Sequence, residues 1–315
     1  MDMKKTVLSF GETLWDLLPN GRTLGGAPFN LAYRVNGLGD RGMIASRLGR
    51  DDLGREAWDR VAALGMETTL LQWDNCYPTG TVHVSFGPEN APDYLIVADV
   101  AYDRIEPTAE LLDVVRRADC ISFGTLAQRA GESREALARL LAVSPTSLKL
   151  LDINLRKKCF SRKTVSLSLQ KADILRCNED ETHGTAELLG MPDRGIVAFC
   201  EEMIARWSLS HCLVTLGERG AYAASAGGEK AHVPGYRVAV VDTLGAGDAF
   251  TAGFLHRFLR RAPLAECLEL GNALGAIVAC QQGATEPVTS SDLARFLAAD
   301  HVRISDKSLE QFICS

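Results

Sequence analysis

Short apolar runs that alternate with longer amphipathic stretches set the strongest limit on the fold of this chain. The runs TVLSFG, CISFG, KLLDIN, ADILRCN and HCLVTLG each end near a Gly, Asn or Asp. Between them lie stretches of helical periodicity, such as residues 51–65 and 133–143. Strands that alternate with helices form a parallel sheet that is covered by helices on both faces. The sequence therefore predicts a doubly wound, mostly parallel α/β fold.

Polar and small residues follow several of these predicted strands. In an open parallel sheet, binding groups gather outside the carboxyl ends of the strands. This rule places five residues at one edge of the sheet: Gly124, Asp152, Asn154, Asn178 and Gly217.

Two segments depart from the strand–helix alternation. Residues 13–18 follow the first strand with more strand-like sequence, and residues 79–86, TGTVHVSF, place Val82, Val84 and Phe86 on one face. A turn-rich stretch then leads into YLIVA, a pattern that predicts a hairpin. We expect one α/β domain over residues 1–315, with a small β lid inserted from about 12–24 and 72–103.

The composition excludes several functional classes. The chain has 315 residues, 46% of them apolar, and a net charge of −6, whereas nonspecific nucleic-acid binding usually requires a basic excess. No run reaches the roughly 20 apolar residues of a membrane helix, and the amino terminus does not resemble a signal peptide. Nine scattered cysteines are typical of reduced thiols. We therefore expect a cytoplasmic protein without nucleic-acid or membrane partners.

One glycine motif is misleading. GLGDRG, from Gly37 to Gly42, matches the G-x-G-x-x-G pattern of dinucleotide sites, which must follow a strand and open a helix. Here a helical pattern comes before the motif and a strand-like pattern follows it. This reversed order disfavours a dinucleotide site.

The stretch VVDTLGAGDAFTAGFL, residues 240–255, is the strongest candidate for chemistry. The preceding YRVAVV alternates like a strand, and Phe250, Phe254 and Phe258 then recur at helical spacing. A helix that begins near Gly247–Asp248 would expose unpaired amides in its first turn. Gly245 and Gly247 have no Cβ to keep an anion away, and Ala246 adds little bulk.

Two interpretations of Asp248 remain open. It could cap the helix, which is a common role for aspartate. Alternatively, a carboxylate beside an anion hole suits phosphoryl transfer, since it can accept a proton from an attacking hydroxyl. An ordinary aspartate pKa of about 4 would leave it ionised at neutral pH.

The segment DTLGAGDAFTAGFL resembles the carboxyl-terminal signature of the ribokinase-like (PfkB) carbohydrate kinases. The segment from Gly25 to Gly49, which begins GGAPFNLAYRVNGLG, resembles the amino-terminal signature of the same family. GETLWDLLP, NEDE, LVTLGERGAY and GNALGAIVACQQGA lie in family order, so the resemblance spans nearly the whole chain. It implies a ribokinase-like fold with a β lid and direct transfer of the γ-phosphate of ATP to a sugar hydroxyl, with Mg²⁺.

The resemblance also implies individual roles near the sugar. Asp248 is the catalytic base, and the amides of Gly245, Ala246 and Gly247 form the anion hole. The implied sugar-binding residues are Asp16, Gly25, Gly26 and Asn30. Arg156 lies in LDINLR, which resembles the D-P-N-x-R segment of fructokinases with Ile153 in place of proline. Arg156 could reach a phosphate or the sugar, or form a surface salt bridge.

Further positions match the nucleotide and ion sites of the family. Asn178 and Glu181 match the N-x-x-E element, which positions magnesium and phosphate, with Glu181 reaching Mg²⁺ through water; an ordinary acidic helix start is the alternative. Asp242 and Thr243 match a monovalent-cation loop, for K⁺, that not every member uses. The other implied nucleotide-binding residues are Thr215, Gly217, Gly220 and Asn272.

The acceptor sugar is less constrained. GETLWDLLP and DINLR favour fructose, but VADVAYDRI stands where fructokinases and ketodeoxygluconate kinases carry an aromatic-Arg-x-x-Ser-Ala segment. Other hexoses, 2-keto-3-deoxygluconate, ribose or a nucleoside remain alternatives, as does a sugar-binding regulatory protein without catalysis. Lid strands with one apolar face could also pair two subunits into a homodimer.

Overall fold

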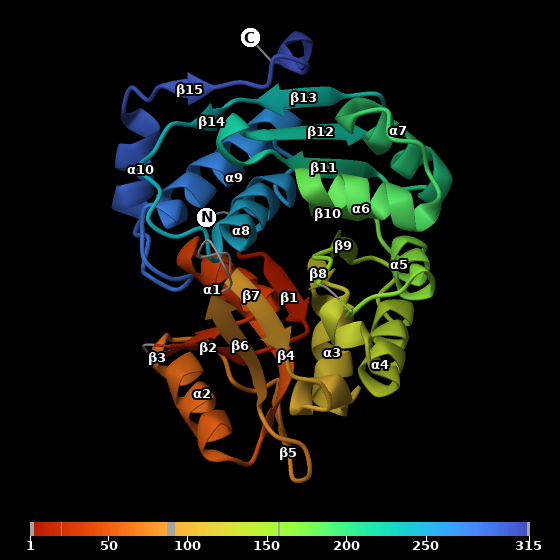
Figure 1. The fold of residues 1–315 in the computed structure, drawn as a ribbon, viewed down its shortest axis with the longest axis vertical. Coiled ribbons are helices and arrows are strands. Elements are labelled where there is room, and N and C mark those ends of the chain that lie inside the picture. Colours follow the sequence, from red (N-terminus) through yellow and green to blue (C-terminus); the bar gives the residue numbers. More distant parts are fainter. Residues whose placement is uncertain (1–2, 20, 87–91, 157, 314–315) are drawn as a thin grey trace.

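The computed structural model describes residues 3–19, 21–86, 92–156 and 158–313 (Figure 1). A nine-stranded sheet has the order β13-β12-β11-β10-β9-β8-β1-β4-β5. The strands from β11 to β5 are parallel, whereas β12 is antiparallel to both of its neighbours, β11 and β13. Their bounds are β1 Thr6–Phe10, β4 Arg41–Gly49, β5 Leu71–Asp74, β8 Cys120–Phe123, β9 Leu148–Asp152, β10 Ile174–Asn178, β11 His211–Thr215, β12 Ala221–Ser225 and β13 Lys230–Val233.

Helices cover both faces of this sheet, as the alternating pattern predicts. Successive strand residues alternate between two cores: Leu8 and Leu151 pack with α3 to α7, whereas Val7 and Leu150 pack with α1, α8 and α9. The bounds are α1 Ala27–Gly37, α2 Asp52–Ala63, α3 Ala109–Arg117, α4 Gly131–Ala142, α5 Arg162–Leu169, α6 Glu179–Leu189, α7 Ile196–Trp207, α8 Ala246–Phe258, α9 Leu264–Ala279 and α10 Ser290–Ala298.

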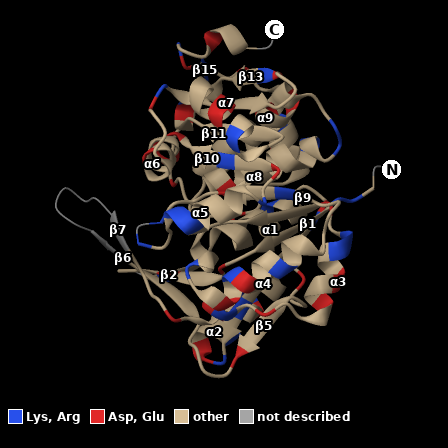
Figure 2. Cartoon of the chain, turned by 90° about the vertical axis from the view of Figure 1, so that its right-hand side faces the viewer, with Lys and Arg blue, Asp and Glu red and all other residues tan. Residues whose placement is uncertain are grey.

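A second, four-stranded sheet has the order β3-β2-β6-β7. Its strands are β2 Leu14–Leu18, β3 Gly21–Gly25, β6 Gly80–Phe86 and β7 Pro92–Ile96. β2 and β6 are parallel, and the outer pairs, including the predicted hairpin of β6 and β7, are antiparallel. β2 and β6 lie at one side of the molecule (Figure 2). We call this four-stranded unit the small sheet.

The limits of the small sheet differ from the predicted segments. β5 pairs with β4 in the main sheet, so residues 72–74 of the predicted 72–103 segment belong there. β3 ends at Gly25, one residue beyond the predicted 12–24 segment. The turn at residues 87–91, and the side chains of Val84 and Phe86, lie outside the described residues.

The strand expected at residues 236–241 is absent. Only Gly235–Tyr236 form a strand, β14, which pairs with β15, Arg303–Ile304. Beyond it, the Val241 amide donates to the carbonyl of Ala279 at the end of α9, 2.8 Å away, and Val240 and Val241 are more than 60% exposed. The alternation of apolar residues therefore belongs to an extended segment along α9. Short 3₁₀ turns also occur among the described residues: η2 Ala101–Arg104, η3 Leu126–Gln128, η4 Gly217–Arg219 and η5 Glu310–Phe312.

Among the residues that the structure describes, no helix has both the length and the apolar character required to cross a bilayer.

Replacing Arg129 with Met should destabilise the segment that leaves the small sheet. Arg129 donates to both carboxylate oxygens of Asp103 at 2.8 and 2.9 Å and to the carbonyl of Val97 at 2.6 Å, and Asp103 is only 2% exposed. Removing one partner of a buried pair costs about 3–5 kcal/mol. Urea unfolding should report this loss.

Arg41→Met is the matched control. Arg41 forms an exposed pair with Glu67, and exposed pairs contribute about 1 kcal/mol or less. Equal destabilisation by the two variants would contradict the interpretation of the Asp103 pair.

Candidate active site

A cleft of about 840 Å³ lies where the carboxyl ends of the strands, the small sheet and the start of α8 meet. It brings together most of the residues predicted from the sequence, although they are spread over more than 250 positions. The predicted residues that line it are Asp16, Gly26, Asn30, Arg156, Asn178, Thr215, Gly217, Gly220, Asp242, Thr243, Gly245, Ala246, Gly247, Asp248 and Asn272. Gly25 and Glu181 are not among the lining residues.

The start of α8 has no side-chain cap. Gly245 is its N-cap residue, in the left-handed region at φ 77°, and the carboxylate of Asp248 instead accepts a hydrogen bond from Asn30 Nδ2 at 2.9 Å. The alternative that Asp248 merely caps the helix is therefore wrong. The first turn of α8 is held by its own backbone, which leaves the Asp248 side chain available to the cleft.

Two of the three predicted anion-hole amides are open. In the described part of the chain, the Gly245 and Gly247 amides have no hydrogen-bond acceptor, whereas Ala246 donates to the carbonyl of Thr243 at 3.2 Å. The chain makes a tight turn from Thr243 to Ala246 before the helix, and the Ala246 amide forms the hydrogen bond that closes this turn. The predicted role of the Ala246 amide is therefore not supported by its geometry.

The pKa of Asp248 is raised to about 6, first by burial and second by the nearby Asp152 carboxylate. Asn30, Arg176 and Arg156 act in the opposite direction. The expectation of an ordinary pKa near 4 is therefore corrected. Asp248 remains mostly ionised at neutral pH, but its proton affinity is closer to that needed for a general base.

Arg176 is a site residue that the sequence analysis missed. It lies in β10, 7% exposed, and donates to Asp152 Oδ1 and to Thr215 Oγ1, each at 3.1 Å. A Cβ on Gly247 would come within 2.7 Å of its Nη2 atom, so the guanidinium lies against the anion hole. An arginine inside the otherwise apolar run ILRCN, two residues before Asn178, is the signal that could have identified it.

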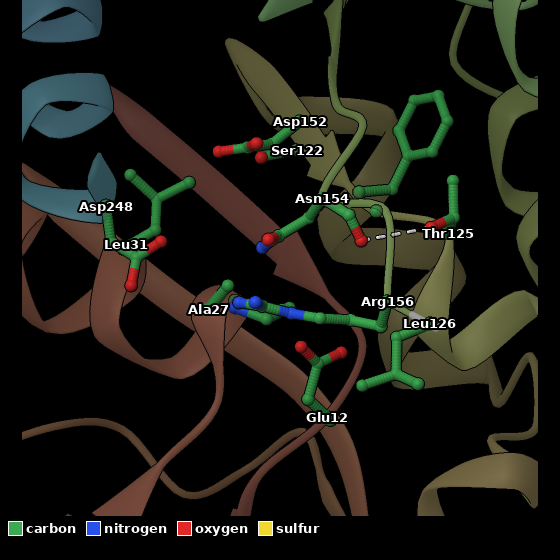
Figure 3. A pocket seen from close by; sticks show the side chains of 13 residues that line it. Glu12, Ala27, Leu31, Ser122, Thr125, Leu126, Asp152, Asn154, Arg156 and Asp248 are labelled. Carbon is green, nitrogen blue, oxygen red and sulfur yellow. Dashed lines mark hydrogen bonds between the residues drawn. The ribbon is translucent and has the colours of Figure 1, made fainter. Parts of the chain in front are cut away.

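Three ionisable side chains face one another at the small-sheet end of the cleft. Burial raises the pKa of Glu12 to about 7 and that of Asp16 to about 6, and Arg156 opposes both shifts. In Figure 3, the Arg156 side chain extends across the pocket between Glu12 and Asn154, with Asp248 at the far wall. No described residue pairs with the Arg156 guanidinium. Glu12 was not predicted from the sequence.

The backbone next to Glu12, Asp16 and Arg156 is held in unusual or crowded conformations that fix where these side chains lie. Asn154 has φ 44°, an uncommon value for a residue with a side chain, and its carbonyl accepts a bond from Thr125 Oγ1 at 3.3 Å. A Cβ on Gly26 would come 2.4 Å from the carbonyl of Glu12, and one on Gly25 would come 2.9 Å from Asp16 Oδ2. Gly26 therefore makes room for the backbone of Glu12, and Gly25 makes room for the Asp16 carboxylate.

Asn178 and Glu181 form a reciprocal capping box at the start of α6. Asn178 Oδ1 accepts from the Glu181 amide at 2.8 Å, and Glu181 Oε2 accepts from the Asn178 amide at 2.9 Å. Glu181 Oε1 also accepts from the Leu155 amide at 3.0 Å, next to Arg156. The pair thus has the structural role of a helix start, and it also fixes the loop that carries Arg156.

The nucleotide end of the predicted site is partly structural. Asn272 Nδ2 donates to the carbonyl of Val233 at 2.9 Å, and a Cβ on Gly220 would come 2.0 Å from the same carbonyl. Gly217 has φ 58° in the turn after β11. These residues shape the wall, while the unpredicted segment 235–240 lines much of it.

In the predicted cation loop, both carboxylate oxygens of Asp242 accept hydrogen bonds from backbone amides. Asp242 Oδ1 accepts from the Leu244 amide at 2.9 Å, and Oδ2 accepts from the Gly283 amide at 3.0 Å. Within the described residues, no group of three His, Cys, Asp or Glu side chains is arranged to hold a metal ion.

Comparison with known proteins agrees with this geometry. Fructokinase-1 of rice (Oryza sativa subsp. japonica) is 29% identical over 307 residues, covering 88% of this chain and 93% of the rice protein. The crystal structure of an uncharacterized sugar kinase from Pyrococcus horikoshii is 26% identical with a TM-score of 0.80, covering 92% of this chain and 97% of that one. Aminoimidazole riboside kinase from Salmonella enterica, solved with aminoimidazole riboside and an ATP analog, is 26% identical with a TM-score of 0.77 and covers 93% and 100%.

These similarities and the observed sheet order confirm the predicted ribokinase-like fold. The model of the pfkB family carbohydrate kinases matches residues 6–291, nearly the whole chain. The protein belongs to the pfkB family of carbohydrate kinases and is a sugar kinase.

Proposed function

We propose that this kinase transfers the γ-phosphate of ATP to a primary hydroxyl of a neutral sugar, with fructose as the first candidate. The observation that carries the proposal is the position of the Asp248 carboxylate beside the open amides of Gly245 and Gly247 in one cleft. Asp16 and Glu12 at the other end of the cleft can accept hydrogen bonds from sugar hydroxyls.

In this mechanism, Asp248 takes the proton of the attacking hydroxyl as the new O–P bond forms. The Gly245 and Gly247 amides and the Arg176 guanidinium stabilise the charge that develops on the transferred phosphoryl group. Asn30 holds Asp248 Oδ2, and its own buried Oδ1 has no partner among the described residues, so it can accept a bond from the sugar. Transfer is direct, without a phospho-enzyme.

Magnesium would arrive with ATP and neutralise phosphate charge. Both carboxylate oxygens of Glu181 already accept backbone amides, so contact through water fits this residue better than direct ligation. Asp242 and Thr243 remain the proposed site for K⁺.

Fructose is favoured because the rice relative is named fructokinase. Among the described residues, the basic side chains that line the cleft are Arg156, Arg176 and Arg237, and they do not form a cluster at the small-sheet end that would bind a phosphorylated sugar. Ribosides are the second candidate, since the Salmonella relative binds aminoimidazole riboside. We further propose a cytoplasmic location, supported by the free state of the described cysteines, and a homodimer through the small sheet.

A coupled ADP-release assay with Mg-ATP and a sugar panel tests the proposal. The panel should hold fructose, other hexoses, 2-keto-3-deoxygluconate, ribose and nucleosides. We expect sugar-dependent turnover, with the largest kcat/KM for fructose. Saturable sugar binding without turnover would instead identify a regulatory protein, and a riboside preference would move the substrate to the second class.

The pH dependence of kcat/KM should have a steep acid limb. Asp248 and Asp16 have pKa values raised to about 6, and both act in their ionised forms. Activity should therefore fall as the pH drops from 7 to 5, with a limiting slope greater than one on a logarithmic plot. Asp16→Asn should reduce that slope by about one and raise the sugar KM. An unchanged slope would show that the ionisation of Asp16 does not contribute to the acid limb.

A further inference from the structure

Arg34 is a buried cation that the mechanism above does not use. It lies in α1, its side chain is buried with a residue exposure of 3%, and within the described residues no carboxylate pairs with it. It donates instead to two backbone carbonyls, from Nη1 to Glu286 at 2.7 Å and from Nη2 to Ala284 at 2.6 Å. Burial lowers the pKa of Arg34. The Asp248 and Glu286 carboxylates attract Arg34 without a direct ion pair. Burying a guanidinium without a directly paired carboxylate is costly, so the two hydrogen bonds hold their partners firmly.

Both carbonyls belong to residues 280–288, the loop between α9 and α10. This loop lies directly behind the anion hole: a Cβ on Gly245 would come 2.5 Å from the Cβ of Ala284. In the same loop, the Gly283 amide donates to Asp242 Oδ2 at 3.0 Å. The loop therefore supports both ends of the segment from Asp242 to Gly245.

The same helix also contacts Asp248. Asn30 lies one turn before Arg34, and residues four apart share a helix face. Asn30 holds the Asp248 carboxylate, and Arg34 holds the loop behind the open amides. Helix α1 therefore positions both the Asp248 carboxylate and the loop behind the anion hole.

We propose that Arg34 is a positioning residue for phosphoryl transfer, which keeps the 280–288 loop against Gly245 and so fixes the open amides relative to Asp248. The backbone of the first turn of α8 is bonded to itself, but α8 has no side-chain cap, so the 280–288 loop supplies the contact that fixes the position of Gly245 from outside the helix. Small displacements of such groups lower the rate more than they lower substrate binding. The inference rests on the proposed roles of Asp248 and the two amides.

A double-mutant cycle in the full-length enzyme tests the proposal. Arg34→Met removes the loop anchor, and Ala284→Gly keeps Arg34 and both acceptor carbonyls but removes the contact with Gly245. Each variant should lower kcat by roughly 10- to 100-fold and leave the sugar KM within about threefold. The double variant should lose little more than the worse single variant, because both act through the same contact. Arg34→Lys should recover part of kcat.

Additive losses, or a kcat within threefold of wild type in both single variants, would overturn the proposal. If Arg34→Met does not fold, Ala284→Gly decides alone. Arg47→Met is the control for losing a largely buried arginine: the Arg47 side chain is 14% exposed, pairs with Asp74 and Glu106, and lines none of the described pockets. It should lose stability but keep kcat. Retained turnover in Asp248→Asn would refute the proposed base, a separate failure.

Discussion

Asp248→Asn is expected to lower kcat by a factor of about 10³ or more while the enzyme still binds its sugar. General-base contributions reach about 10²–10⁴, and Asn cannot accept the hydroxyl proton. The substitution preserves shape, and the Asn30 amide can still donate to the remaining side-chain oxygen. Single-turnover phosphorylation, together with sugar binding by calorimetry, should separate the lost proton transfer from binding.

The same variant should be more stable than the wild type at neutral pH. The pKa of Asp248 is raised from 3.8 to about 6 in the folded enzyme, so the folded state binds this proton more tightly than the unfolded state does. Stability therefore falls as the pH rises from about 4 to 6 and stays low above that. Asn does not titrate and avoids this loss. Thermal unfolding at pH 5 and 7.5 should show the difference growing with pH.

Wild-type turnover in Asp248→Asn would exclude Asp248 as the base. Loss of activity together with lower stability at pH 7.5 would indicate misfolding instead. The expected combination, an inactive but more stable protein, is typical of a residue that function keeps in an unfavourable environment.

The sequence was sufficient for features that depend on local pattern. Alternation of buried runs with amphipathic stretches predicted the layered sheet, because both faces of a parallel strand must be apolar. Gly245 and Gly247 before the phenylalanine repeat located the start of α8. Residues 236–241 show the limit of this reasoning, since apolar alternation also occurs in an extended segment whose amide bonds to a helix end.

Long-range contacts could not be predicted in this way. Asn30 and Asp248 are 218 residues apart, and Arg34 and Ala284 are 250 apart, so no local pattern records either contact. Glu12 and Arg176 become site residues only because the sheet order brings β1, β9 and β10 to one edge. N-x-x-E is ambiguous for another reason, since a capping box and an ion site use the same two side chains.

Arg176→Met should reduce kcat by about 10²–10³, as expected for losing one donor that stabilises developing charge. The loss should be greater at pH 6 than at pH 8. Arg176 lowers the pKa of Asp248, and burial and Asp152 raise it, so removing Arg176 weakens the opposition to the raising effects. The acid limb of the kcat profile should therefore move to higher pH. Arg176→Lys keeps the charge and should leave the limb near its wild-type position.

A second substitution separates electrostatics from structure. In Arg176→Met/Asp152→Asn, the carboxylate that raises the pKa of Asp248 is also gone, so the acid limb should return toward its original pH. The kcat plateau at high pH should stay low, because the phosphoryl group still lacks the guanidinium. A recovered plateau would mean that Arg176 contributes to kcat only by neutralising the negative charge of Asp152. A limb that never moves would mean that Arg176 does not influence Asp248, and the geometry at Gly247 would then be a packing contact alone.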